Sequence, residues 1–152
     1  MITTTTIVCR RAAVSGGLLD LEMAGPAELQ LGVRGGLLTF AVAVVVDLAP
    51  DDLGTTPEIR ISVGAVHDGG KGMDRVKLTA FELAAEGEGD QFVTILGDAK
   101  DVAVSPELGP LGGFRFFAAF NFVDQTLPAG NYAFATEANG ALSSMAPFRI
   151  VD

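Results

Sequence analysis

The chain of 152 residues is poor in the residue types that build most catalytic and metal sites. It has one cysteine (Cys9), one histidine (His67), one tyrosine (Tyr132) and no tryptophan. A single cysteine cannot form a disulfide within the chain, and any Ser-His-Asp or histidine-metal site must include His67. We therefore expect a protein that is not an enzyme and holds no cofactor.

Positive charge is scarce as well, with 10 Lys and Arg against 19 Asp and Glu and a formal net charge of −9. Such a chain repels a phosphate backbone, so no nucleic acid partner is expected. The longest run of low polarity, Leu37 to Val46, is far shorter than the roughly 20 residues of a membrane helix, and the first residues lack the order of a signal peptide. We expect a cytoplasmic protein, or a virion-associated one if it is of phage origin, with no membrane partner.

Hydrophobic residues make up 49% of the chain and charged residues only 19%, which excludes a disordered protein. The length suits one domain, and we expect residues 1–152 to form a single β-sandwich domain. Four Gly-Gly pairs separate segments rich in Val, Ile, Phe and Thr, which are typical of strands. The candidate strands are Thr3–Val14, Leu18–Met23, Leu37–Leu48, Ile59–Ala65, Arg75–Ala85, Gln91–Leu96, Val102–Val104, Phe114–Val123, Asn131–Ala138 and Pro147–Val151.

This pattern predicts an all-β fold, an antiparallel two-sheet sandwich of about eight or nine strands. Residues 77–86 also contain good helix formers; we favour a strand there and keep a helix as the alternative. Leu37–Leu48 has no polar face, which predicts a central strand.

The segment Phe114–Val123 is apolar on both faces, although a sandwich buries only one. Its second face carries Phe117, Ala119 and Val123, which need a cover. The cover is either a loop of the same chain or another subunit, and these three residues are our candidate interface.

A short pattern near the C-terminus reads Leu127-Pro128-Ala129-Gly130-Asn131-Tyr132. It resembles the tyrosine corner of immunoglobulin-like sandwiches, as found also in small bacterial and phage sandwich domains. The resemblance implies that the Tyr132 hydroxyl bonds to an upstream backbone group, with Pro128 and Gly130 shaping the turn. The chain departs from antibody domains, because it lacks a tryptophan and a cysteine pair, and Phe134 stands where they place a cysteine.

Two loops could hold a ligand. The loop of residues 67–74 contains His67 and a glycine-rich stretch that lacks the spacing of a phosphate-binding loop. The loop of residues 86–90 alternates Glu86, Glu88 and Asp90 with glycine, an arrangement whose carboxylates could bind Ca²⁺. Solvated loop charge explains the same residues.

We therefore predict a non-enzymatic structural or protein-interaction module that self-associates into a homo-oligomer, as a subunit of a bacterial or viral assembly. The alternative is a β-sandwich that binds a small ligand or Ca²⁺ through residues 67–74 and 86–90. A binding module needs polar groups that converge in a concave site, whereas an assembly subunit needs an apolar face or an unpaired edge strand.

Overall fold

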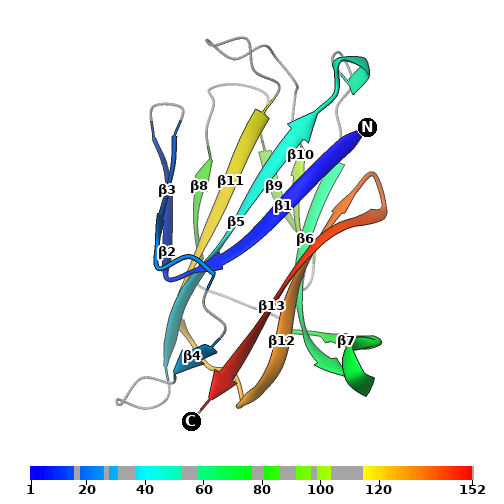
Figure 1. Cartoon of the computed structure of the whole chain (residues 1–152). Coiled ribbons are helices and arrows are strands. Elements are labelled where there is room, and N and C mark those ends of the chain that lie inside the picture. Colours follow the sequence, from blue (N-terminus) through cyan, green and yellow to red (C-terminus); the bar gives the residue numbers. More distant parts are fainter. Residues whose placement is uncertain are drawn as a thin grey trace.

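The computed structural model describes residues 1–15, 18–25, 28–30, 37–52, 58–76, 81–85, 92–96, 99–103 and 115–151. These residues form strands joined by turns, with two short 3-10 helices, η1 (Pro50–Asp52) and η2 (Asp68–Gly70), and no α-helix (Figure 1). The all-β class is therefore confirmed.

The first sheet contains four strands in the order β1-β5-β11-β8, each antiparallel to its neighbour. They are β1 (Ile2–Cys9), β5 (Leu38–Leu48), β11 (Arg115–Gln125) and β8 (Phe81–Ala85). β5 lies between two neighbours, so its prediction as a central strand is confirmed. The part of the ambiguous segment that the structure describes, Phe81–Ala85, is a strand.

The second sheet has the order β4-β13-β12-β6-β10-β9, with one further strand, β7, beside β6. Its strands are β4 (Glu28–Gln30), β13 (Ala141–Val151), β12 (Gly130–Ala138), β6 (Glu58–His67), β10 (Ala99–Ala103), β9 (Phe92–Leu96) and β7 (Gly72–Arg75). All its pairs are antiparallel except β4 with β13, which is parallel.

Several predicted strands have different boundaries in the structure. The segment expected as Arg75–Ala85 is not one strand, because β7 ends at Arg75 and β8 begins at Phe81, and the strand expected as Val102–Val104 is Ala99–Ala103. The segment expected as Thr3–Val14 breaks at Arg10, where the chain leaves the first sheet and begins β2 (Arg11–Ser15). The last strand begins six residues earlier than expected, at Ala141, because a tight turn at Asn139 and Gly140, both with positive φ, lets β13 pair with β12 at once. The described residues form thirteen strands in all, more than the eight or nine expected.

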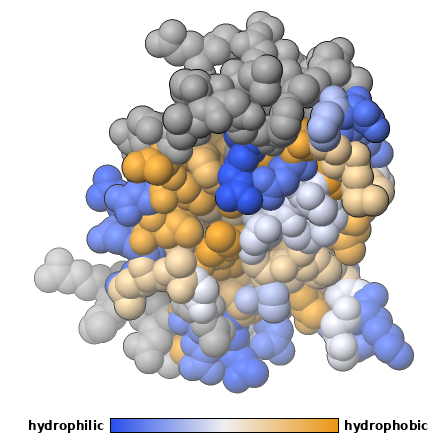
Figure 2. Space-filling model, turned by 45° about the horizontal axis from the view of Figure 1, so that its top comes forward, coloured by the Kyte–Doolittle hydropathy of each residue, from blue (hydrophilic) through white to orange (hydrophobic). Residues whose placement is uncertain are grey.

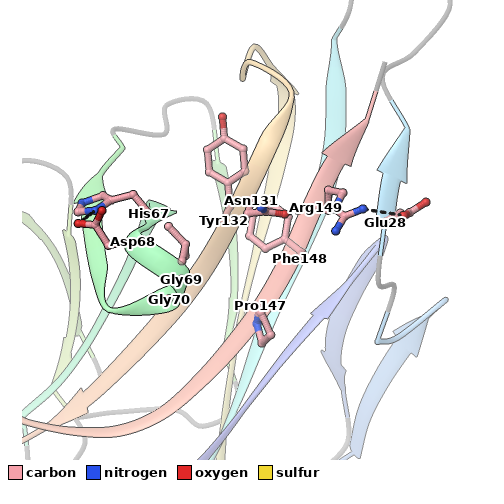
Figure 3. A pocket seen from close by; sticks show the side chains of 11 residues that line it. Glu28, His67, Asp68, Gly69, Gly70, Asn131, Tyr132, Pro147, Phe148 and Arg149 are labelled. Carbon is pink, nitrogen blue, oxygen red and sulfur yellow. Dashed lines mark hydrogen bonds and ion pairs between the residues drawn. The ribbon is translucent and has the colours of Figure 1, made fainter.

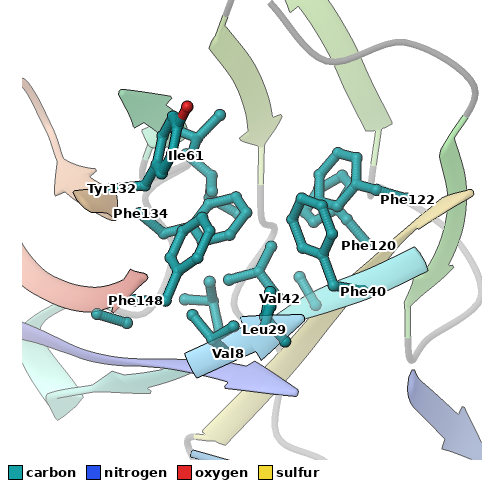
Figure 4. Packing of buried hydrophobic residues seen from close by; sticks show 14 of the residues in the cluster. Val8, Leu29, Phe40, Val42, Ile61, Phe120, Phe122, Tyr132, Phe134 and Phe148 are labelled. Carbon is teal, nitrogen blue, oxygen red and sulfur yellow. The ribbon is translucent and has the colours of Figure 1, made fainter. Parts of the chain in front are cut away.

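Phenylalanine fills the space between the two large sheets (Figure 4). Phe40 of β5 and Phe122 of β11 face Phe134 of β12 and Phe148 of β13, with ring centroids 5.4–6.1 Å apart. Successive side chains of a strand point to opposite faces of the sheet, so phenylalanines at every second position of a strand enter the same layer.

A separate two-stranded hairpin, β2 with β3 (Leu18–Glu22), covers the outer face of the first sheet. Between the hairpin and the sheet lies a second core of small buried residues: Cys9, Ala12, Ala41, Ala43 and Ala119. The partly buried Val14, Leu19 and Leu21 pack against it. The side chain of Asn121 holds the hairpin by two hydrogen bonds, accepting from the Ala12 amide at 3.0 Å and donating to the Ala12 carbonyl at 2.8 Å. An amide side chain on β11 thus replaces a backbone partner for β2.

Candidate functional site

The predicted interface residues lie in three different environments. Ala119 is fully buried beneath the β2–β3 hairpin, so the chain itself covers this part of the second face. Phe117 is partly buried, and Val123 is 36% exposed. Of these three residues, Phe117 and Val123 are therefore the two that can contact a partner in the folded chain.

The tyrosine segment makes a local hydrogen bond between side chain and backbone. The Tyr132 hydroxyl donates to the carbonyl of Pro128 at 2.6 Å, and its ring stacks on Phe148 with centroids 5.6 Å apart. Burial raises the pKa of the Tyr132 hydroxyl. Gly130, with a φ of 158°, begins β12. These residues shape a turn at the end of the sandwich and leave the phenol bound to the chain's own backbone.

A hollow of about 640 Å³ lies beside the η2 turn, between it and the ends of β12 and β13 (Figure 3). His67 lies at one side of it, where Nδ1 is 2.8 Å from Asp68 Oδ2 and Nε2 is 3.4 Å from Asp74 Oδ1. Gly72 lies against the imidazole, and a Cβ at that position would overlap the ring. Both ring nitrogens therefore face carboxylates, one from η2 and one from β7.

On the other side of the hollow, Arg149 points away from His67, with the ring of Tyr132 between them (Figure 3). The Arg149 Nε donates to Asn131 Oδ1 at 3.1 Å, and Nη1 is 3.5 Å from Glu28 Oε1. The charged side chains of the hollow thus pair with one another. A site for a polar ligand requires polar groups that converge on one point, and these do not.

The predicted calcium ligands Glu86, Glu88 and Asp90 lie outside the described residues. Within the described ranges, no group of three or more His, Cys, Asp or Glu side chains could hold a metal ion. None of the helices in those ranges is long and apolar enough to cross a membrane.

A different feature emerges where the edges of the two sheets meet, on the side that faces the reader in Figure 1. Threonines of β1 reach the second sheet through hydroxyl groups. Ser144 Oγ lies 2.6 Å from the hydroxyls of both Thr4 and Thr6, and Thr6 is also 2.7 Å from Thr136 Oγ1. Thr136 is fully buried, so these contacts form an internal hydroxyl chain that fixes β1 to β13 and β12.

The same side of the molecule carries no charged side chain over β1 or over β13 from Ala141 to Phe148. Two charge pairs lie at its two ends. The Met1 ammonium lies 3.1 Å from Asp52 Oδ2, and Arg149 lies beside Glu28. We call this surface the β1–β13 edge.

The β1–β13 edge also exposes apolar side chains. Leu142 is 61% exposed and Met145 is 45% exposed, both on β13. Met145 lines a groove of about 290 Å³ between β1 and β13, together with Ile7 and Pro147. Figure 2 shows a patch of hydrophobic and weakly polar residues on this side, with strongly hydrophilic residues directly beside it near the middle of the view as well as toward the margins.

The β1–β13 edge was not among the predicted sites. The signal was present as four consecutive threonines after Ile2, alternating between the two faces of a strand, and as the pair Ser143-Ser144. The sequence contains no signal that brings these segments together, because the hydroxyls that meet are separated by 130 to 140 residues.

The described residues thus form a layered all-β fold in which every strand pair except β4 with β13 is antiparallel. No protein-family model matches the chain, and no curated protein matches it in sequence.

Proposed function

We propose that this chain is a non-enzymatic protein-interaction module with an immunoglobulin-like sandwich, and that it self-associates as a subunit of a larger assembly. One observation carries the proposal: β1 is an edge strand that is uncharged over its whole length, in a chain with a net charge of −9. Soluble proteins normally protect such edges with charges, proline or a bulge.

The immunoglobulin-like part of the proposal draws on the two facing sheets and on the Tyr132 hydroxyl bound to Pro128. In this proposal the protein acts in the cytoplasm, or in a virion if it is of phage origin. Phe117 and Val123 supply a second, smaller contact, because they stay accessible beside the β2–β3 hairpin.

The test is the native mass by light scattering after size-exclusion chromatography, over a hundredfold range of protein concentration. We expect a defined oligomer. Because the chain carries many negative charges, salt should strengthen the association by screening repulsion between copies. A monomer at every concentration and at both low and high salt would contradict the proposal.

The second candidate, a small-ligand or calcium module, is favoured only by the hollow beside His67. Its test is the melting temperature with and without millimolar Ca²⁺, since a ligand that binds the native state raises it. An unchanged melting temperature would contradict calcium binding. A rise that disappears in a chain with Glu86→Gln, Glu88→Gln and Asp90→Asn would locate the ion in that loop.

A further inference from the structure

We propose that two copies of this chain join by antiparallel pairing of β1 with β1, across a two-fold axis, so that their four-stranded sheets become one continuous sheet. This inference rests on the proposed self-association and names the surface that performs it.

The first argument is the state of the β1 backbone. β1 pairs with β5 without interruption from Ile2↔Leu48 to Cys9↔Ala41, so it is a regular strand with no bulge. On the side away from β5, no other described strand pairs with it. Among the residues that the structure describes, the one backbone bond there involves the end of the strand, where the Gly25 amide donates to the Val8 carbonyl at 2.7 Å. Every second residue of Ile2–Ile7 therefore turns its amide and carbonyl away from β5 and offers them to an added strand.

The second argument is a comparison with β13, the other strand at this edge. The end of β13, Arg149–Val151, is already paired with β4. Pro147 has no amide hydrogen to offer, which is a common protection of edge strands. β1 has no proline, no charge, no bulge and no covering strand within the described residues. Of the two, β1 is the edge that is open to pairing.

The third argument identifies the occupant as a second copy. Two molecules with a charge of −9 repel each other, and they approach at least cost through a surface without charge. β1 itself carries no charge, and the charges beside its first residues are paired, Met1 with Asp52 and Asp47, which lies opposite Thr3, with Arg115. An antiparallel contact of a strand with itself obeys two-fold symmetry, which is the commonest symmetry of oligomers.

The alternation of side chains restricts the register. Thr3 and Thr5 point outward and are exposed, whereas Thr4 and Thr6 point toward the second sheet. In the continuous sheet, residues directly opposite each other lie on the same face, so outward residues must pair with outward residues. This holds only if the two-fold axis lies at one residue, which then pairs with its own copy, and not midway between two residues. An axis at Thr4 or at Thr5 sets threonine opposite threonine, a favourable cross-strand pair.

The test uses charge at the two exposed threonines. One variant carries Thr3→Glu and Thr5→Glu, and a second carries Thr3→Lys and Thr5→Lys. Both positions are solvent-exposed, which favours folding of each variant, but Thr3 lies opposite Asp47 of β5, so circular dichroism and thermal melting must first show that each variant folds like the unmodified chain. The matched control, Leu18→Glu with Ala129→Glu, adds the same negative charge at exposed positions away from β1.

We expect each threonine variant alone to weaken association roughly tenfold or more, because like charges face each other across the axis. An equimolar mixture of the two variants should associate again, since opposite charges then face each other. The control should associate like the unmodified chain, within the change that two added negative charges cause.

Each other outcome separates the two proposals. If the unmodified chain is monomeric throughout, self-association itself fails. If it is oligomeric and both threonine variants associate as tightly, self-association stands and β1 pairing is overturned. If only one sign of charge weakens association, or if the mixture does not recover, β1 contacts a different surface and the two-fold pairing is overturned.

Discussion

The two faces of the β5–β11 pair are both buried, yet they are built from different residues. The inner face carries phenylalanine, as at Phe40 and Phe120, and packs against a full second sheet. The outer face carries alanine, as at Ala43 and Ala119, and packs against a two-stranded hairpin. Stacked sheets lie about 10 Å apart and need large side chains to fill the gap. The alanines let the hairpin approach more closely.

This difference teaches how an apolar second face should be interpreted. A strand without a polar face predicts that both faces are covered, but not whether the cover comes from the same chain. The size of the side chains helps to decide between the two, because alanine buries little apolar area and therefore contributes little to the affinity for a separate subunit. Phe117, the large residue on that face, is the one that the hairpin leaves partly exposed.

The largest expected effect is in the inner layer. Phe134 is 1% exposed, and its ring lies 5.5–6.1 Å from three other phenylalanine rings. Phe134→Ala should lower the free energy of unfolding by about 3–5 kcal/mol, because it removes buried area and leaves a cavity. Urea denaturation measures the change, and Phe134→Leu should cost clearly less. A loss below about 1 kcal/mol would mean that the two sheets do not depend on this contact.

A substitution in the outer layer should act by crowding. Ala119→Leu adds three carbon atoms beneath the hairpin and should cost about 1–3 kcal/mol. The effect should be local: hydrogen exchange should accelerate in β2 and β3 more than in β12 and β13. Equal acceleration in all four strands would show that the two layers unfold as one unit.

The two hydrogen bonds of Asn121 give a third test of the difference between the layers. Asn121→Ala leaves the Ala12 amide and carbonyl without their partner and should cost about 1–2 kcal/mol. Asn131→Ala, on the exposed face of β12, is the control and should cost no more than about 0.5 kcal/mol. If both variants unfold at the same urea concentration, the hairpin is held by its apolar contacts alone.

Much of the inner layer could be predicted from the sequence, whereas the outer layer could not. Alternation and apolar runs identified β5, β6, β11 and β12, because burial on a pleated strand leaves a period of two. The role of Asn121 could not be found in this way. Its position as a polar residue in an apolar strand was visible, but its partner, Ala12, is 109 residues away and contributes only backbone atoms.

The break at Arg10 escaped prediction for a related reason. The residues on both sides of it favour strand equally well, so local preference extends one strand from Thr3 to Val14. The chain bends there because β2 pairs with β3 over the outer face, and the Arg10 amide donates to the Glu22 carbonyl at 3.0 Å. Only the three-dimensional pairing decides between one strand and two.

The smallest expected effect concerns pH and separates the layers by their ionisable groups. Cys9 lies fully buried in the outer layer, and burial raises the pKa of its thiol from 9.0 to about 11. The fold therefore favours the neutral thiol. This contribution is complete below pH 9, where the thiol is protonated in both states, and is lost as the pH rises toward 11. At pH 10 the loss is about 1 kcal/mol.

Denaturation in urea at pH 7 and at pH 10 measures this loss. Burial also raises the pKa of Tyr132 in the inner layer, so its titration acts in the same direction. Cys9→Ala should remove one part of the alkaline loss and Tyr132→Phe the other, and the double variant should remove both. If Cys9→Ala leaves the pH dependence unchanged, the thiol meets solvent before the protein unfolds. The hairpin would then open as a unit separate from the phenylalanine core.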